Sequence, residues 1–165
     1  MTQRADPSVH ASAVLVGDRA VLIRGPSGAD KSHLAFDLIM SGKAGQIAPT
    51  QLVGDDRVYL TVVAGHLIVS PAPELAGLIE IRGLGIRRCD FAASGRVGLV
   101  VDLAAPDSAR MPPEEALKAT LLDVRLPRIP VSAGIAALPL VVAALTTTNG
   151  YSPLQAPRER LLEGN

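Results

Sequence analysis

One stretch of the chain, residues 20 to 43, constrains the fold more than any other. An apolar run at 20–23 leads into a loop that reads Gly25-Pro26-Ser27-Gly28-Ala29-Asp30-Lys31-Ser32. Leu34, Ala35, Leu38 and Ile39 then recur at helical spacing, and Ser41-Gly42 predicts the end of that helix. A strand that runs through a glycine-containing loop into a helix indicates an α/β fold whose helix N-terminus binds phosphate.

The loop is close to the nucleotide-binding pattern G-x-x-x-x-G-K-[ST]. Gly25 and Gly28 allow the backbone to curl so that its N–H groups converge on a β-phosphate. Lys31 is expected to reach the β- and γ-oxygens, and the Ser32 hydroxyl to bind Mg²⁺. The alternative, an ordinary turn that precedes Lys-Ser, is less favoured because a strand pattern precedes the loop and an apolar helix face follows it.

Asp30 departs from that pattern because it stands where the second glycine belongs. A carboxylate ~5 Å from one phosphate charge, at an effective dielectric of about 20, costs on the order of 3 kcal/mol. That corresponds to roughly a hundredfold in affinity. Two arrangements avoid the repulsion: Asp30 turns outward to cap the helix, or it joins the coordination shell of the magnesium ion.

The rest of the sequence predicts one α/β domain with a mixed sheet at residues 10–148, between a flexible N-terminus at 1–9 and a tail at 149–165. The expected elements are strands at 13–16, 20–23, 51–53, 58–63 and 66–69, one or two helical turns at 74–78, a strand buried on both faces at 97–103, a helix start at 112–115, proline-interrupted edge strands over 121–131, and a last core helix at 138–145.

Composition excludes several classes of function. The 165 residues carry 16 basic and 16 acidic side chains and no Trp, so neither a positive field nor stacking platforms favour nucleic acid or an anionic membrane. Apolar stretches such as 135–145 are too short to span a bilayer, and the N-terminus has no secretory signal pattern. Cys89 is the only cysteine, which is typical of a reducing cytoplasm.

Two acids, Asp55 and Asp56, follow the short apolar strand. Neighbours in a strand point to opposite faces, so only one of the pair is expected to face the phosphate site. One acid can take the proton from an attacking hydroxyl while the other holds metal or structure. On spacing alone, a solvated Gly-Asp-Asp-Arg turn explains the pair equally well.

The segment Glu80-Ile81-Arg82-Gly83-Leu84-Gly85 decides between those interpretations. Its Gly-x-Gly lacks the third glycine of a dinucleotide site. The segment instead resembles the signature of the HPr kinase/phosphorylase family, and a phosphate loop, Asp-Asp and this segment occur in the order of that family. The resemblance covers roughly residues 8 to 145, the C-terminal catalytic domain, so we expect a short single-domain form without the N-terminal domain of longer members.

This resemblance implies a P-loop kinase fold similar to phosphoenolpyruvate carboxykinase and HPr kinase. It also implies ATP- and Mg²⁺-dependent phosphorylation of a serine on an HPr-like phosphocarrier protein of the phosphotransferase system, often in a hexamer. By resemblance Lys31 binds phosphate and Asp56 deprotonates the target serine. Ser32 and Glu80 match the magnesium ligands, with Asp55 as a further candidate.

Three further positions are compared with the family pattern. His10 matches an active-site histidine, although the usual His-Gly is His10-Ala11 here, and Arg110 aligns loosely with an active-site arginine. Residues 131–134 read Val-Ser-Ala-Gly where larger members carry Pro-Gly-Arg-Asn, which argues against phosphorylase activity. Arg82 is expected to steady either Asp56 or the transferred phosphoryl group.

Two other functions stay open. A degenerate member of the family would dock HPr or a sensor histidine kinase and transfer nothing, and Asp30 motivates that hypothesis. An unrelated P-loop ATPase or small-molecule kinase is less favoured because no second ATPase signature is present. The remaining polar candidates are interpreted as surface residues: His33, His66 and Arg87-Arg88.

Overall fold

The computed structural model describes residues 8 to 148 and residue 150. The strands are β1 (Ser12–Val16), β2 (Arg19–Arg24), β3 (Thr50–Gly54), β4 (Val58–Val63), β5 (His66–Pro71), β6 (Leu78–Ile81), β7 (Gly85–Arg88), β8 (Gly95–Asp102), β9 (Lys118–Leu121) and β10 (Val124–Pro130). The helices are α1 (Lys31–Lys43), α2 (Ala137–Thr146) and the short 3-10 helices η1 (Pro73–Leu75) and η2 (Glu114–Leu117).

The predicted flexible start and tail lie mostly outside the described residues. Val9 is the exception, since it exchanges two backbone hydrogen bonds with Val58, at 2.8 and 3.0 Å. Ordered pairing therefore begins one residue before the predicted domain boundary at residue 10.

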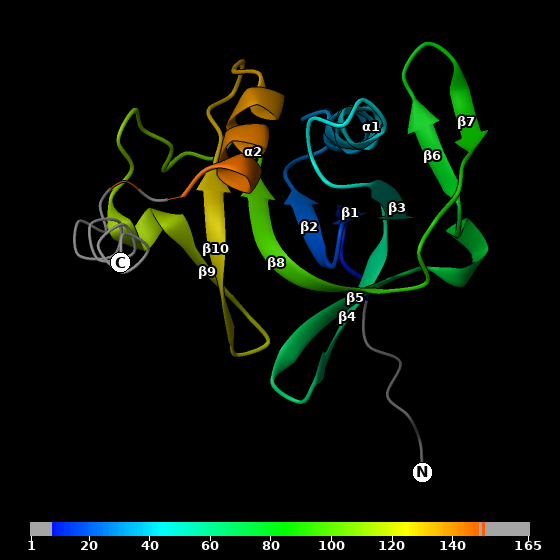
Figure 1. The fold of residues 1–165 in the computed structure, drawn as a ribbon, viewed down its shortest axis with the longest axis horizontal. Coiled ribbons are helices and arrows are strands. Elements are labelled where there is room, and N and C mark those ends of the chain that lie inside the picture. The colour runs from blue at the N-terminus through cyan, green and yellow to red at the C-terminus, as the bar shows by residue number, and fades with distance from the viewer. Residues whose placement is uncertain (1–7, 149, 151–165) are drawn as a thin grey trace, which may run out of the picture.

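The mixed sheet that the sequence predicts is present and has eight strands. Its main path runs β3-β1-β2-β8-β10-β9, with the β4–β5 hairpin joined through β5 to β8 (Figure 1). Strands β2, β8 and β10 are parallel neighbours, whereas the outer pairings are antiparallel. The carboxyl ends of the three parallel strands therefore lie at one edge, which is where α/β sheets bind ligands.

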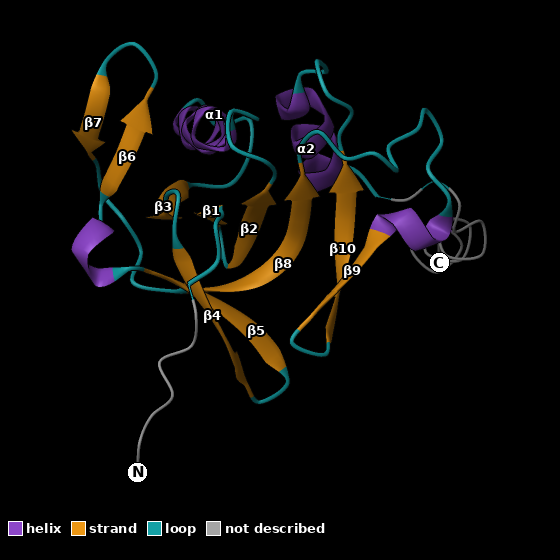
Figure 2. Cartoon of the chain, turned by 180° about the vertical axis from the view of Figure 1, so that it is seen from behind, coloured by secondary structure: helices purple, strands orange, loops and turns teal. Residues whose placement is uncertain are grey.

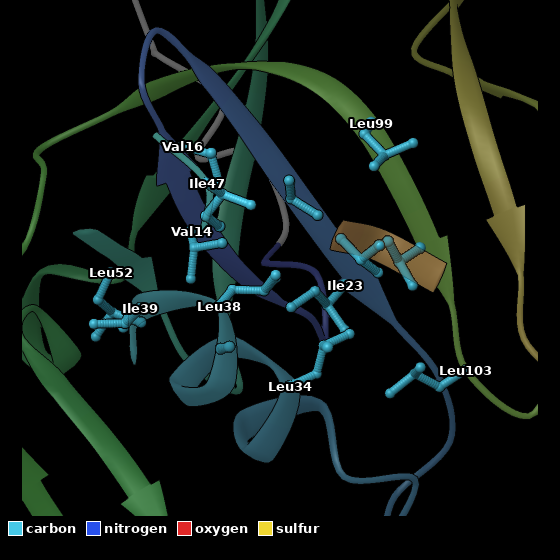
Figure 3. Close-up of a cluster of buried hydrophobic side chains, with 14 of the residues drawn as sticks. Val14, Val16, Ile23, Leu34, Leu38, Ile39, Ile47, Leu52, Leu99 and Leu103 are labelled. Atoms are coloured by element: carbon cyan, nitrogen blue, oxygen red, sulfur yellow. The ribbon is translucent and has the colours of Figure 1, made fainter. Parts of the chain in front are cut away.

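Alternation along the strands divides the apolar residues between two faces. Val21 and Ile23 of β2 belong to the cluster beneath α1 and α2, with Leu34 and Leu38 of α1 (Figure 3). The neighbouring β2 residues Ala20 and Leu22 belong to a second cluster, which the β4–β5 hairpin covers (Figure 2). The two helices thus share one face, and α1 begins at the end of the phosphate loop.

Strand β10 corrects the prediction of edge strands over residues 121–131. It lies between β8 and β9 and is interior in the sheet order. Residues 124–127 pair only with β9 and residues 128–130 only with β8. Each half therefore leaves one side unpaired, which is how a strand with Pro127 and Pro130 tolerates an interior place.

Two predicted helical segments are shorter than expected. The turns predicted at 74–78 shrink to η1, and the helix start at 112–115 yields only η2. The last predicted helix is α2, in which only Val141 is fully buried, while Leu138, Val142 and Leu145 pack against the core. Within the described part of the chain, no helix is both long and apolar enough to cross a bilayer.

The signature segment lies on a hairpin that the sequence pattern does not predict. Strands β6 and β7 pair with each other as a separate two-stranded sheet, and β6 contacts α1 (Figure 1). Ile81 accepts a hydrogen bond from the Leu84 N–H at 2.9 Å, which closes the turn. Residues 80–82 are thereby held beside the phosphate loop.

Candidate active site

The predicted phosphate loop at residues 25–32 connects β2 directly to α1. Gly25 lies so close to the segment after β8 that a Cβ there would stand 3.1 Å from the Leu103 Cβ and 3.2 Å from its carbonyl oxygen. Only glycine fits that approach without a shift. The Ala29 N–H donates to the Pro26 carbonyl at 3.1 Å and closes the turn ahead of α1.

Lys31 lies at the first position of α1 and is only 7% exposed. Its Nζ donates to the carbonyl oxygens of Gly25 at 2.9 Å and Pro26 at 3.1 Å. These hydrogen bonds offset the cost of burying the ammonium group. The positive charge is thereby held against the loop on which phosphate is expected.

Asp30 does not take the helix-capping arrangement expected for it. Its backbone has φ 70° and ψ 39°, the left-handed conformation that suits glycine and that Asp tolerates better than most residues. Its side chain makes no cap hydrogen bond to α1. Instead Asp30 Oδ1 lies 2.8 Å from Arg82 Nη2. Arg82, expected near Asp56 or the transferred phosphoryl group, pairs with the acid in the loop.

Asp55 is buried and 4% exposed. Its Oδ1 accepts hydrogen bonds from the Ser12 hydroxyl at 2.7 Å and the Ser32 hydroxyl at 2.6 Å. Its Oδ2 accepts the Glu80 backbone N–H at 3.0 Å. One carboxylate therefore ties together β1, the start of α1 and the signature hairpin.

Asp56 has a different environment from its neighbour. It is exposed, and its Oδ1 lies 3.0 Å from His10 Nε2. Strand β3 ends at Gly54 and Asp56 has φ 66°, so strict alternation no longer applies to the pair. As expected, only one acid of the pair, Asp56, lines the cavity beside the phosphate loop, whereas buried Asp55 contacts the loop by accepting the Ser32 hydroxyl.

That cavity has a volume of about 470 Å³. The predicted site residues that line it are His10, Ser27, Gly28, Asp30, Lys31, Ser32, Asp56, Glu80, Ile81 and Arg82. We call it the acid-lined cavity. It brings the phosphate loop, the candidate base and the signature segment together in one place.

Some predicted site residues lie outside the acid-lined cavity. Arg110 is exposed between β8 and η2 and does not line it. Gly83, Leu84 and Gly85 form the exposed turn of the β6–β7 hairpin. Their position indicates that the turn supports the hairpin shape, while Glu80 and Arg82 face the loop.

The residues predicted to bind magnesium can be compared with the ligands that this ion prefers. Within residues 8–148, no three His, Cys, Asp or Glu side chains gather closely enough to hold a metal by themselves. Mg²⁺ prefers oxygen ligands and usually keeps several waters, binding through one or two carboxylates and substrate phosphates. Ser32 and Glu80 line the cavity, and the Asp55 carboxylate lies behind the Ser32 hydroxyl, so the oxygen donors present match that chemistry.

Three residues of α1 that were not predicted as site residues also line the acid-lined cavity. They are His33, Phe36 and Asp37. The His33 side chain is 72% exposed, as expected of a surface residue, and its Nε2 lies 3.3 Å from Asp37 Oδ2. Phe36 lies four residues after Ser32 and Asp37 four residues after His33, and this helical spacing is the signal that could have placed them beside the loop.

Sequence reasoning also missed a charge network beneath the phosphate loop. Arg24 donates two hydrogen bonds to Asp102, both 2.7 Å, and Arg128 donates to the same carboxylate and to Asp107. Burial alone would raise the pKa of Asp102, but hydrogen bonds from Arg24 and Arg128 outweigh it and lower that pKa. The network links β2, β8 and β10 at their carboxyl ends, and the phosphate loop follows directly after β2.

Comparison with known proteins identifies the family. The family model for the HPr Serine kinase C-terminal domain matches residues 3–156. Curated relatives include the HPr kinase/phosphorylase of Geobacillus thermodenitrificans (strain NG80-2), 36% identical over 77% of this chain and 43% of that protein. The HPr kinase/phosphorylase of Enterococcus faecalis (strain ATCC 700802 / V583) is 36% identical over 93% of this chain and 53% of that protein.

A solved structure agrees with these matches. The Hpr(Ser) kinase/phosphatase from Coxiella burnetii superposes with a TM-score of 0.67 at 26% identity, covering 97% of this chain and 100% of that one. The predicted P-loop kinase fold is thereby confirmed. This chain spans about half the length of the curated relatives it matches. It belongs to the HPr serine kinase C-terminal domain family.

Proposed function

We propose that this chain is a cytoplasmic, ATP- and Mg²⁺-dependent kinase that phosphorylates a serine of an HPr-like phosphocarrier protein. The observation that carries the proposal is the acid-lined cavity, where Asp56 with its His10 partner and the phosphate-loop Lys31 open onto the same space. A base on one side and a phosphate cradle on the other are the two parts that phosphoryl transfer requires.

In this mechanism Asp56 takes the proton of the serine hydroxyl as its oxygen attacks the γ-phosphorus. The new O–P bond forms as the bond to the β–γ bridging oxygen breaks, and ADP leaves with that electron pair. Asp56 is exposed and has one partner, His10, so it can meet a hydroxyl presented from outside. His10 would hold the Asp56 carboxylate in place and share the proton.

Lys31 would neutralise charge on the phosphate oxygens, from a position already fixed by two loop carbonyls. Ser32, Asp55 and Glu80 would hold Mg²⁺, which when bound with ATP draws negative charge from the phosphates. Asp55 also holds the Ser32 side chain in place, because the Ser32 hydroxyl donates to it at 2.6 Å.

Arg82 supports an active kinase in spite of Asp30. Its guanidinium lies 2.8 Å from the Asp30 carboxylate, so the pair adds no net charge beside the phosphates. The repulsion estimated for an unpaired Asp30 therefore does not apply in full. Glycine's backbone conformation is also retained at this position.

The same ion pair supports a second candidate, a regulatory module that binds HPr and transfers nothing. Asp30 and Arg82 connect the phosphate loop to the signature hairpin, and both line the acid-lined cavity. If that pair excludes nucleotide, the chain would retain a docking surface without its phosphoryl donor. An HPr-like protein or a sensor kinase would then be its partner.

Transfer to HPr separates the two candidates. Purified protein, Mg·ATP and an HPr protein are incubated, and phosphoserine on HPr is measured by mass spectrometry. The kinase proposal expects phosphoserine with the wild type, none with Lys31→Ala, and unchanged transfer with Lys43→Ala, an exposed lysine at the far end of α1. Binding of HPr without any phosphoserine would favour the regulatory module.

The family resemblance also suggests a homo-oligomer, with a hexamer as the expected state. Light scattering coupled to size-exclusion chromatography measures its mass directly. A monomer at micromolar concentration would contradict this part of the proposal.

A further inference from the structure

The turn that carries the two acids lies against the chain segment that enters β1. On one side of the turn Ala13 pairs with Gly54, and on the other side Val9 exchanges two backbone hydrogen bonds with Val58. Between these two points the backbone pairing is interrupted, and side chains make the connection instead. The geometry of the acids therefore depends on which side chains the entering segment supplies.

Asp56 occupies the centre of this turn in an uncommon conformation. The Arg57 N–H donates to the Asp55 carbonyl at 2.7 Å, so the turn closes over three residues, and Asp56 has φ 66°. A three-residue turn with a positive φ at its centre is the rarer, strained form of γ-turn. Such a backbone persists only where the surrounding structure holds it. The candidate base thus depends on the groups that fix this turn.

Ser12 of β1 contacts the turn from inside the protein. Its hydroxyl donates to Asp55 Oδ1 at 2.7 Å, and its oxygen accepts the Asp56 backbone N–H at 3.4 Å. Ser12 is fully buried, and along β1 it continues the row of Val14 and Val16, which belong to the apolar cluster beneath α1. A buried hydroxyl in such a row is costly unless it is hydrogen-bonded, so these two contacts fix its orientation.

His10 and Ser12 hold Asp56 from opposite sides. The exposed His10 side chain places its Nε2 3.0 Å from Asp56 Oδ1, at the carboxylate. The buried Ser12 hydroxyl contacts the Asp56 main chain and the side chain of its neighbour Asp55. The carboxylate is therefore held from the solvent side and the backbone from the core side.

Building on the proposed kinase function, we infer that Ser12 is a positioning residue for the general base. It holds the strained turn so that the Asp56 carboxylate meets the acceptor hydroxyl in the geometry of in-line attack. Ser12 does not line the acid-lined cavity, so it touches neither nucleotide nor acceptor. Its loss therefore slows phosphoryl transfer and leaves nucleotide binding intact, because a displacement of about 1 Å in a reacting group can cost about a hundredfold in rate.

The first test measures phosphoserine formation on HPr by Ser12→Ala and its Mg·ATP affinity by isothermal titration calorimetry. We expect kcat to fall about tenfold while the Kd for Mg·ATP changes by less than about twofold. Ser12→Thr restores the hydroxyl and should bring kcat back to within about threefold of the wild type. Thermal melting checks that each variant folds. Ser12→Cys, which has a weaker donor of similar size, replaces Ser12→Ala if the alanine variant does not fold.

Ser41→Ala is the matched control for this substitution. Ser41 is also a buried serine, but its hydroxyl donates to the Asp37 carbonyl within α1 and not to either acid of the turn. The control should leave kcat within about twofold of the wild type. Equal losses of kcat in Ser12→Ala and Ser41→Ala would mean that Ser12 acts only through general stability, which overturns the inference.

The second test needs no activity. Amide hydrogen exchange, followed by NMR, reports whether Ser12 holds the turn. The Asp56 N–H should exchange about tenfold faster in Ser12→Ala than in the wild type, because its acceptor is removed. The Val58 N–H, which donates to the Val9 carbonyl at 3.0 Å, should keep its rate.

The outcomes separate this inference from the kinase proposal. Wild-type protein that forms no phosphoserine would overturn the kinase proposal and the role of Ser12 in catalysis with it. An active wild type together with unchanged kcat in Ser12→Ala, or with unchanged exchange at Asp56, would overturn the inference alone. A selective loss of kcat together with faster exchange at Asp56 supports it.

Discussion

Four carboxylates around the phosphate loop form two contrasting pairs. The inner acids, Asp55 and Asp102, are buried or nearly so, and each accepts three hydrogen bonds. The outer acids, Asp30 and Asp56, are exposed, and their side-chain partners are Arg82 and His10 respectively. We infer from this difference that the inner acids hold the site together, while the outer acids remain accessible to ligand.

The largest expected effect separates chemistry from stability at an outer acid. Asp56→Asn keeps a side chain that tolerates the positive φ but cannot accept the serine proton. We expect kcat for HPr phosphorylation to fall about a thousandfold, since general-base groups contribute this order of magnitude. Urea unfolding should give a free energy within about 0.5 kcal/mol of the wild type. If Asp56→Asn lowered the free energy of unfolding as strongly as it lowered the activation of HPr phosphorylation, Asp56 would be a structural acid like Asp55 and Asp102.

The next effect concerns the inner acid Asp102. Asp102→Asn leaves Arg24 and Arg128 without their shared carboxylate, and the free energy of unfolding should fall by about 3 kcal/mol at pH 7. A substitution at exposed Asp18, paired only with its neighbour Arg19, is the matched control and should change stability by less than about 0.5 kcal/mol.

The same network predicts a pH dependence. The pKa of Asp102 is lowered in the folded protein, so its contribution to stability is present above the unfolded pKa of about 3.9. That contribution is lost as the pH falls through the folded pKa. Urea unfolding between neutral pH and pH ~3 should therefore show a steeper acid loss for the wild type than for Asp102→Asn. If the unfolding free energies of wild type and Asp102→Asn fell in parallel with decreasing pH, the acid loss of stability would not come from Asp102.

Asp55→Asn tests the other inner acid against its sequence neighbour. The substitution removes the negative charge of a carboxylate that accepts hydrogen bonds from two hydroxyl groups and one backbone N–H. The expected loss is about 2 kcal/mol of unfolding free energy, measured by urea titration. The comparison with Asp56→Asn is matched, because both change one carboxylate oxygen to NH₂. A smaller loss at Asp55 than at Asp56 would contradict the assignment of inner and outer roles.

The smallest effect lies at the outer ion pair. Arg82→Ala leaves the Asp30 carboxylate unpaired beside the phosphates, so Mg·ATP should bind about tenfold more weakly by calorimetry. Arg87→Ala, on the same hairpin outside the acid-lined cavity, serves as the control and should leave affinity unchanged. Tighter binding in Arg82→Ala would mean that the pair blocks the nucleotide.

The phosphate loop could be predicted because its signal is local. Strand, loop and helix follow one another without interruption, and residues 25–32 fold with their immediate neighbours. Strand β8 was likewise predicted from its continuous apolar run, which is typical of a strand covered on both faces. The family signature added the site residues that lie farther along the chain.

Long-range pairing could not be predicted in the same way. Nothing near Asp30 in the sequence indicates Arg82, because the pair depends on where the β6–β7 hairpin packs beside α1. The Arg24–Asp102–Arg128 network needs the strand order β2-β8-β10, which no local pattern fixes. The prolines of β10 led to the wrong prediction of edge strands for the same reason. The two halves of β10 pair with different strands, one with β9 and the other with β8.

If the proposed kinase function is right, Arg82 compensates for Asp30 in the phosphate loop and the enzyme is active with that aspartate in place. Asp30→Gly tests it most directly, with the rate of phosphoserine formation on HPr at saturating Mg·ATP as the measurement. We predict a rate within about threefold of the wild type, because the charge removed is already neutralised. An inactive wild type that gains about a hundredfold on restoring the glycine would contradict this compensation and identify a degenerate phosphate loop.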